Sequence, residues 1–172
     1  MFGFFFIEFI IKLTIMAQEI ERKFLLKDHT FKAISKQKKM IIQGFLSTVP
    51  ERTVRIRIID NQGFITIKGI SNESGASRFE WEKEIDTKEA EDLIKICAPG
   101  VIHKTRYYVK SGKHTFEVDE FHDENKGLVI AEIELSSEKE SFKKPKWLGK
   151  EVTGEVKYYN SMLVNNPYKN WK

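Results

Sequence analysis

Charged residues recur two positions apart along this chain, and both members of each pair carry the same sign. The acidic pairs are Glu19/Glu21, Glu80/Glu82, Glu117/Asp119 and Glu132/Glu134. The basic groups are Arg55/Arg57, Lys104/Arg106, Lys23, Lys68 and Arg78. Residues i and i+2 of a β-strand point to the same face, so each pair would present two like charges together. Such neighbours repel each other and are costly to bury unless opposite charges or ligands lie close by.

Two environments could account for these charged strand faces. For any single pair, an exposed face in water is the usual explanation, because charged residues are mostly found at the surface. An ordinary wet face would mix serine, threonine, glutamine and lysine, whereas these faces are dominated by charge and sorted by sign from strand to strand. Taken together, the pairs favour a sheet that closes into a barrel, with its charged face lining an enclosed tunnel.

The chemistry of the two sets indicates what such a tunnel could hold. Arginine offers a planar fork that binds phosphate oxygens in pairs, and lysine offers a compact positive charge. Carboxylates without histidine or cysteine partners suit a hard cation such as Mg²⁺ or Mn²⁺, which also coordinates phosphate oxygens. The chain has no G-x-x-x-x-G-K-[ST] motif, so a P-loop does not cradle the phosphates. A polyphosphate with its bound metal ion would satisfy both sets.

The strands that would carry these pairs are predicted by the alternation of hydrophobic and charged residues. They span residues 19–26, 39–47, 53–58, 64–68, 78–85, 101–110, 115–121 and 128–135. The turns between them are short, which predicts an antiparallel α+β fold built from hairpins. The apolar faces of the strands would then point outward, where the helices and the tail would cover them.

Three helices are expected. Asp86 and Glu89 form a capping-box pattern at the start of one helix, which continues with an amphipathic stripe. A short helix with Phe31 and Ile34 turned inward is expected after the first strand. A third helix is expected in the tail, at residues 158–163.

The 172 residues favour one domain over residues 16–172 preceded by an apolar extension at residues 1–15. The extension is rich in phenylalanine and isoleucine, but Glu8 and Lys12 interrupt it. A membrane-spanning helix needs about 20 mostly apolar residues, and a signal peptide needs a basic start and a small-residue cleavage site. Neither stable membrane insertion nor a part in the fold is therefore expected, and a helix lying on a membrane surface is the second interpretation.

The overall charge and the single cysteine limit the function classes further. A net charge of +4 suits an anionic ligand, and the basic residues lie between acidic ones instead of forming the continuous patch of a nucleic-acid binder. Nucleic acid is therefore not an expected partner. Cys97 is the only cysteine, so no disulfide framework exists and a reducing, cytoplasmic setting is expected.

The same residues form an ordered series of motifs. It runs through Glu19-x-Glu21-x-Lys23, Arg55-x-Arg57, Lys68, Arg78-x-Glu80-x-Glu82, Lys104-x-Arg106, Glu117-x-Asp119, Glu132-x-Glu134, Glu151-Val152-Thr153 and Tyr158-x-Asn160. From residue 17 to about residue 168 the chain resembles the CYTH domain, or triphosphate tunnel metalloenzyme, family. The resemblance implies a closed eight-stranded antiparallel β-barrel with a charged lumen and helices packed outside.

The resemblance also implies roles for individual residues. The implied metal ligands are Glu19, Glu21, Glu117, Asp119, Glu132 and Glu134. The implied phosphate-binding residues are Lys23, Arg55, Arg57, Lys68, Arg78 and Arg106. Lys104 is expected to protonate or stabilise the leaving group, and Glu132 or Glu134 is expected to activate water. The chain departs from the family pattern at Phe45, where small bacterial members often carry tyrosine, and at Gly154, where an acidic residue is common.

Three functions follow as hypotheses. The first is hydrolysis of a small triphosphate, inorganic tripolyphosphate above all, with Mg²⁺ or Mn²⁺ as cofactor. The second is a class IV-type adenylate cyclase that makes cyclic AMP from ATP. The third is a module that binds polyphosphate without catalysis. The expected partner is the triphosphate itself, and a homodimer is left open.

Overall fold

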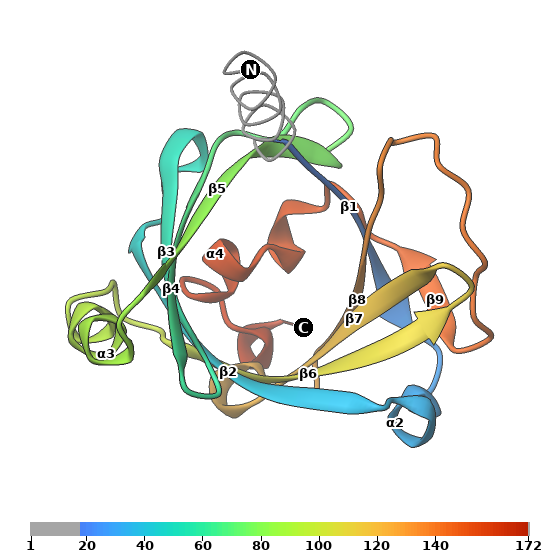
Figure 1. The fold of residues 1–172 in the computed structure, drawn as a ribbon, viewed down its shortest axis with the longest axis horizontal. Helices are drawn as coiled ribbons and strands as arrows, with labels where there is room; N and C mark the ends of the chain where they lie inside the picture. Colours follow the sequence, from blue (N-terminus) through green and yellow to red (C-terminus); the bar gives the residue numbers. More distant parts are fainter. Residues whose placement is uncertain (1–17, 172) are drawn as a thin grey trace, which may run out of the picture.

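The computed structural model describes residues 18–171, and the expected extension at residues 1–15 lies outside them. Eight strands form a closed wall around a central lumen (Figure 1). They are β1 (Gln18–Leu26), β2 (Gln37–Ser47), β3 (Thr53–Ile59), β4 (Gln62–Lys68), β5 (Ser77–Ile85), β6 (Ile102–Ser111), β7 (His114–Phe121) and β8 (Val129–Glu134). Neighbours pair antiparallel in the order β5-β4-β3-β2-β6-β7-β8-β1, which confirms the closed eight-stranded barrel.

The wall closes where β1 meets β5. This seam has three residue pairs, from Gln18–Phe79 to Ile20–Ser77, whereas β6 and β7 share eight pairs. Further along, β1 pairs instead with β9 (Leu148–Glu151). The sequence did not predict β9, because its four residues are too few to establish an alternating pattern.

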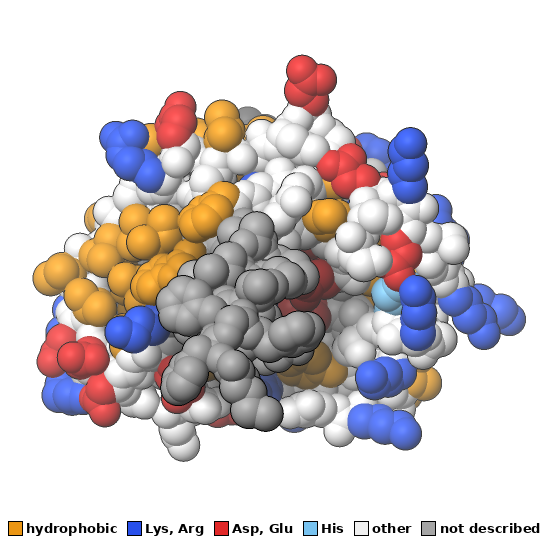
Figure 2. Space-filling view, turned by 45° about the horizontal axis from the view of Figure 1, so that its top comes forward, with side chains coloured by type: hydrophobic (Ala, Val, Ile, Leu, Met, Phe, Trp, Pro, Cys, Tyr) orange, Lys and Arg blue, Asp and Glu red, His pale blue; other side chains and the backbone are white. Residues whose placement is uncertain are grey.

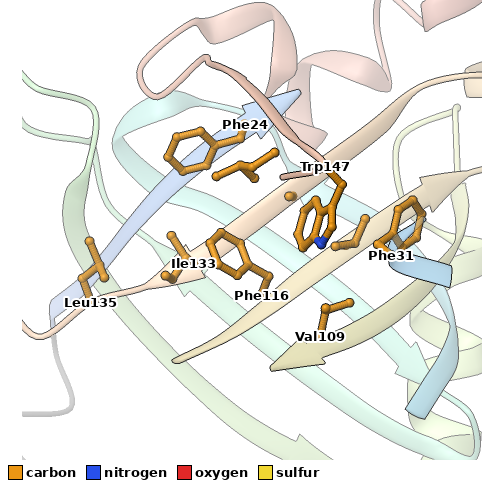
Figure 3. Close-up of a cluster of buried hydrophobic side chains, with 10 residues drawn as sticks. Phe24, Phe31, Val109, Phe116, Ile133, Leu135 and Trp147 are labelled. Atoms are coloured by element: carbon orange, nitrogen blue, oxygen red, sulfur yellow. The ribbon is translucent and has the colours of Figure 1, made fainter. Parts of the chain in front are cut away.

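A buried apolar cluster covers the outside of β1, β6, β7 and β8 (Figure 3). Phe116 of β7 meets Trp147, which precedes β9, with ring centroids 5.4 Å apart. Phe31 of the short helix α2 (Phe31–Ile34) joins the same cluster and is fully buried. Ile34 was expected to point inward but is 55% exposed. The helix ends at Ile34, and Phe31 is the one side chain of α2 that this cluster contains.

The helix α3 (Thr87–Lys95) covers the outside of β3 and β4 as expected. Asp86 caps its first turn, and the Glu89 side chain accepts a hydrogen bond from the Asp86 backbone. Ala90 packs against Ile56 of β3. A Cβ atom at Gly63 of β4 would lie 2.7 Å from the Cβ of Ala90, so the helix can approach this closely only because both residues are small.

The chain after β9 occupies one end of the lumen, although the tail was expected on the outside (Figure 1). Ile102 and Phe121 lie two residues from Lys104 and Asp119, so they share the lumen face of their strands. At this end the lumen face is apolar, and Leu163 of α4 (Asn160–Leu163) packs into it. The tail helix is shorter than predicted, because residues 156–158 form a separate 3-10 turn. The tail therefore closes onto the apolar end of the lumen.

The structure explains why glycine, and not an acidic residue, stands at position 154. Its backbone adopts a φ of +77°, which residues with a side chain rarely adopt. A Cβ atom on Gly75, in the loop between β4 and β5, would lie 2.4 Å from the Cα of Gly154. An acidic residue at position 154 would strain the backbone in the present arrangement of these two loops.

Hydrophobic side chains also gather on part of the outer surface (Figure 2). On the outer face of β5, Phe79 and Trp81 are 49% and 44% exposed. Among the helices of residues 18–171, none has the length and apolar character that crossing a bilayer demands.

Replacing Leu163 with alanine tests the packing of the tail. Leu163 is 1% exposed, and removing a buried leucine side chain leaves a cavity that the surroundings fill only in part. We expect the free energy of unfolding to fall by about 2 to 4 kcal/mol in urea denaturation. An unchanged midpoint would contradict the placement of α4 in the lumen.

Candidate functional site

Charged side chains from seven of the eight barrel strands line one cavity of 180 Å³ in the lumen. Its lining residues are Glu19, Glu21, Lys23, Arg55, Arg57, Lys68, Arg78, Glu80, Lys104, Arg106, Glu117, Glu132, Glu134 and Asn160. Asp119 lies behind this lining, hydrogen-bonded to Lys104 and Arg106. Every residue predicted for the site is therefore in this cavity or bonded to its wall.

Asp119 is the central counterion on the β6 and β7 side. Its side chain is 1% exposed and accepts a hydrogen bond of 2.6 Å from the Lys104 ammonium. The Arg106 guanidinium donates two more, at 2.6 and 2.7 Å, so both carboxylate oxygens are engaged. Burial acts to raise the pKa of Asp119, but Arg106 and Lys104 outweigh burial and lower it. Burial lowers the pKa of Lys104 to about 8 despite the neighbouring carboxylate.

A second network joins β1 to β8. The Lys23 ammonium donates to Glu21 at 2.6 Å and to Glu132 at 2.5 Å, and Glu132 also accepts from Arg106 at 3.1 Å. Burial acts to raise the pKa of Glu132, but Lys23 and Arg106 outweigh it and hold the pKa well below its usual range. Glu132 is therefore an ionised carboxylate between two cations.

On β3, two arginines share one carboxylate. Arg57 donates to Glu82 at 2.8 Å, and Arg55 reaches the same oxygen at 3.4 Å. The Nε atoms of Arg55 and Arg57 are buried and have no hydrogen-bond partner. Burial and the adjacent Arg55 lower the pKa of Arg57 to about 10. This part of the lumen carries positive charge and N–H donors that the protein itself does not satisfy.

The β1–β5 seam is crossed by ion pairs. Glu19 accepts from the Lys68 ammonium at 2.9 and 3.0 Å and from Arg78 Nε at 2.9 Å. Arg78 also reaches Glu21 at 3.2 Å. Burial acts to lower the pKa of Arg78, but Glu21 and Glu19 outweigh it and raise the pKa.

Glu134 differs from the other lumen carboxylates, because its side chain makes no hydrogen bond or ion pair with any of residues 18–171. Burial raises the pKa of Glu134, and the nearby carboxylates Glu19, Glu117 and Glu80 raise it further. The pKa of Glu117 is raised as well, because its burial outweighs its ion pair with Arg106. Negative charge is therefore in excess around Glu134.

These carboxylates fit a hard divalent cation in their chemistry. They are all oxygen donors, and a cation near Glu134 would relieve the repulsion that, together with burial, raises the pKa of this carboxylate. Within residues 18–171, no three carboxylate, histidine or cysteine side chains are gathered closely enough to form a ready-made metal cluster. Lysine and arginine side chains hold most of them in ion pairs instead.

Three residues of this site were given no role from the sequence, although Asn160 stands in the Tyr158-x-Asn160 motif. Thr66 is fully buried, donates to Glu82 at 2.6 Å and accepts from Arg55 at 3.1 Å. Gln43 is also fully buried and donates to Asn160 at 2.8 Å. In the alternation of their strands, Thr66 and Gln43 each stand at a position that faces the lumen. This placement could have identified them as site residues from the sequence. The position of Asn160 depends on where the tail packs, which alternation does not reveal.

A larger cavity of 340 Å³ adjoins the charged one. The two cavities share five lining residues: Lys23, Arg55, Lys68, Arg78 and Asn160. The rest of its wall mixes apolar side chains, such as Phe45 and Met162, with the loop that contains Gly75. The basic side chains of the charged cavity are therefore reachable from this side.

Comparisons with known proteins agree with this geometry. Over 158 residues the chain is 46% identical to an inorganic triphosphatase of Acetivibrio thermocellus, covering 91% of this chain and 99% of that protein. It is 36% identical over 153 residues to an inorganic triphosphatase of Nitrosomonas europaea, and the match covers 85% of this chain and 96% of that protein. The crystal structure of an inorganic triphosphatase matches with a TM-score of 0.60 at 31% identity, covering 85% of this chain and 93% of that one. Residues 17–162 match the CYTH domain, and the chain belongs to this family.

Proposed function

We propose that this protein hydrolyses small triphosphates with the help of a divalent metal ion, and that inorganic tripolyphosphate is its main substrate. The observation that carries the proposal is the pair of buried, unpartnered Nε donors of Arg55 and Arg57. Buried donors are normally satisfied, so these two await an acceptor, and a phosphate oxygen is the acceptor that the guanidinium fork fits best. The names of the two similar triphosphatases support the same substrate.

The phosphate chain would lie along the basic side of the lumen. Arg55, Arg57 and Lys68 would bind its oxygens together with Lys23, Arg78 and Arg106. These charges are fixed in place before the substrate arrives, so they can stabilise the charge that develops on the phosphoryl oxygens without further rearrangement. Lys104 would face the leaving pyrophosphate and supply a proton or positive charge to it.

The carboxylate side would hold the metal ion and accept a proton from the attacking water. Glu19, Glu21, Glu117, Glu132 and Glu134 are the proposed ligands of Mg²⁺ or Mn²⁺. The ion would neutralise phosphate oxygens and favour deprotonation of water. Asp119 was also predicted as a ligand, but both its oxygens are engaged by Lys104 and Arg106, so we assign it the role of counterion. Glu134 has no cationic partner and is the candidate to accept the water proton.

Release of phosphate from tripolyphosphate tests the proposal. We expect hydrolysis with Mg²⁺ or Mn²⁺, a loss of at least about 100-fold after chelation, and recovery when the metal is restored. No hydrolysis of tripolyphosphate, ATP or thiamine triphosphate with either metal would contradict it. Cyclic AMP and pyrophosphate from ATP without phosphate release would select the cyclase. Tight binding of tripolyphosphate without turnover would select the binding module.

We also infer a cytoplasmic setting, because Cys97 is the only cysteine in the sequence, so the chain has no internal disulfide framework and suits a reducing compartment. The sequence left a homodimer open, and gel filtration of the full chain would test it.

A further inference from the structure

Asn160 connects the C-terminal segment to the charged lumen. Its Oδ1 atom accepts a hydrogen bond of 3.1 Å from the Lys104 ammonium and one of 2.8 Å from Gln43 Nε2. Gln43 is fully buried on β2, so it provides a fixed support for the asparagine. Asn160 also lines both cavities and therefore stands where they meet.

The Lys104 side chain needs such a support to keep one orientation. A lysine ammonium sits on a flexible four-carbon stem, whereas an arginine fork is rigid. The Lys104 ammonium has three N–H donors; Asp119 takes one at 2.6 Å and Asn160 takes a second at 3.1 Å. The two acceptors together fix the direction of the third donor, which either acceptor alone would leave free to rotate.

The neutral charge of this acceptor also matters. A carboxylate in the place of Asn160 would cancel more of the positive charge of Lys104 and would repel the oxygens of a phosphate chain. An amide oxygen holds the ammonium by a hydrogen bond and leaves its charge available.

We propose that Asn160, supported by Gln43, is a positioning residue that orients the Lys104 ammonium toward the leaving group of the bound triphosphate. The proposal rests on the proposed function and deepens it. Its physical basis is that two acceptors hold the Lys104 ammonium in one orientation. Such positioning matters because a catalytic group misplaced by about 1 Å can lower the rate roughly 100-fold.

A purely structural role for Asn160 is the alternative, in which it only anchors α4. The apolar packing of Leu163 and Tyr158 already holds the segment in the lumen. We therefore expect Asn160→Leu to leave the fold intact. We expect its kcat to fall roughly 10- to 100-fold while KM stays within about threefold. Asn160→Asp keeps the oxygen acceptor, so its kcat should stay closer to wild type while KM rises from phosphate repulsion.

The double variant with Lys104→Met separates the two roles. If Asn160 acts through Lys104, adding Asn160→Leu to Lys104→Met should cause no further loss of kcat. The exposed Asn165, five residues along the same segment, provides the matched control, and Asn165→Leu should leave kcat and KM unchanged. Additive losses in the double variant would overturn the proposal.

A measurement independent of turnover follows the ammonium itself. In ¹⁵N-lysine NMR spectra, the Lys104 ammonium signal, identified by its absence in Lys104→Met, should shift or broaden in Asn160→Leu. The buried Lys23 ammonium is held by Glu21 and Glu132 and should not change, so it is an internal reference. An unchanged Lys104 signal would overturn the proposal. A wild-type chain that hydrolyses no triphosphate would instead contradict the proposed function, whatever the NMR result.

Discussion

Arg57→Met is expected to lower kcat/KM for tripolyphosphate by roughly 100- to 1,000-fold and, in the same protein, to raise the free energy of unfolding. The loss of activity follows from removing one preorganised cation from the phosphoryl group. The gain in stability follows from the surroundings of this guanidinium, which is buried beside Arg55 with one ion pair of its own, to Glu82.

The lowered pKa of Arg57 sets the expected size of the gain in the free energy of unfolding. Burial and Arg55 lower the pKa of Arg57 from 12.5 to about 10, so the folded state disfavours the charged form. One unit of pKa corresponds to about 1.4 kcal/mol, and Glu82 loses a partner in the variant, so we expect a net gain of roughly 1 to 3 kcal/mol. Methionine keeps the length of the aliphatic part of the arginine side chain and carries no charge.

Steady-state phosphate release and urea denaturation of the same preparations measure the two effects. The control is Arg52→Met, since Arg52 lies on the exposed turn before β3. It should alter neither quantity. A variant with wild-type kcat/KM would contradict a phosphate-binding role for Arg57. A large loss of stability would contradict the inference that the buried Arg57 charge destabilises the folded protein.

Asp119→Asn is expected to lower the free energy of unfolding by about 3 to 5 kcal/mol, the largest effect on stability that we predict. The substitution leaves the volume almost unchanged but removes the carboxylate that faces Lys104 and Arg106, both of them buried. Two buried cations would then remain without their shared counterion, and breaking a buried pair on one side costs more than the pair contributes.

The pH dependence of stability provides a second readout. The pKa of Asp119 is lowered in the folded protein, because Arg106 and Lys104 outweigh its burial. A lowered carboxylate pKa contributes stability above the unfolded value, near 4, and this contribution is lost as the pH falls through the folded value. The wild-type protein should therefore lose stability below about pH 4, and Asp119→Asn should lose less over the same range.

Circular dichroism during urea denaturation, repeated from pH 7 to pH 3, measures both effects. Asp92→Asn is the matched control, because Asp92 forms ion pairs with Lys88 and Lys95 on the exposed face of α3. It should change stability little. Equal losses in the two variants would contradict the role of Asp119 as the buried counterion.

Much of the barrel could be predicted from the sequence, because its strands obey one simple rule. Residues such as Arg55 and Arg57 alternate with valine and isoleucine, and the period of two fixes which side chains share a face. The predicted ranges for β3 and β5 differ from the observed ones by one residue at one end. The sign-sorted charges also predicted correctly that these faces meet in an enclosed lumen.

The parts that could not be predicted depend on tertiary packing. Alternation shows that Asp119 faces the lumen, but only the structure shows that Lys104 and Arg106 occupy both its oxygens. Nothing local to Leu163 indicates that the tail packs inside the barrel end, so the role of Asn160 stayed hidden. The strand β9 is defined by its partner β1 and not by a pattern of its own.

The short seam between β1 and β5 has a consequence for how the lumen and its wall influence each other. Three residue pairs join the strands there, and Glu19 is tied across the seam to Lys68 and Arg78. An anion that attracts Lys68 and Arg78 therefore competes with their ion pairs to Glu19, which help to keep β1 and β5 together. Ligand binding in the lumen and closure of its wall are thus coupled, because Lys68 and Arg78 pair with Glu19 at the seam and are also proposed to bind the phosphate chain.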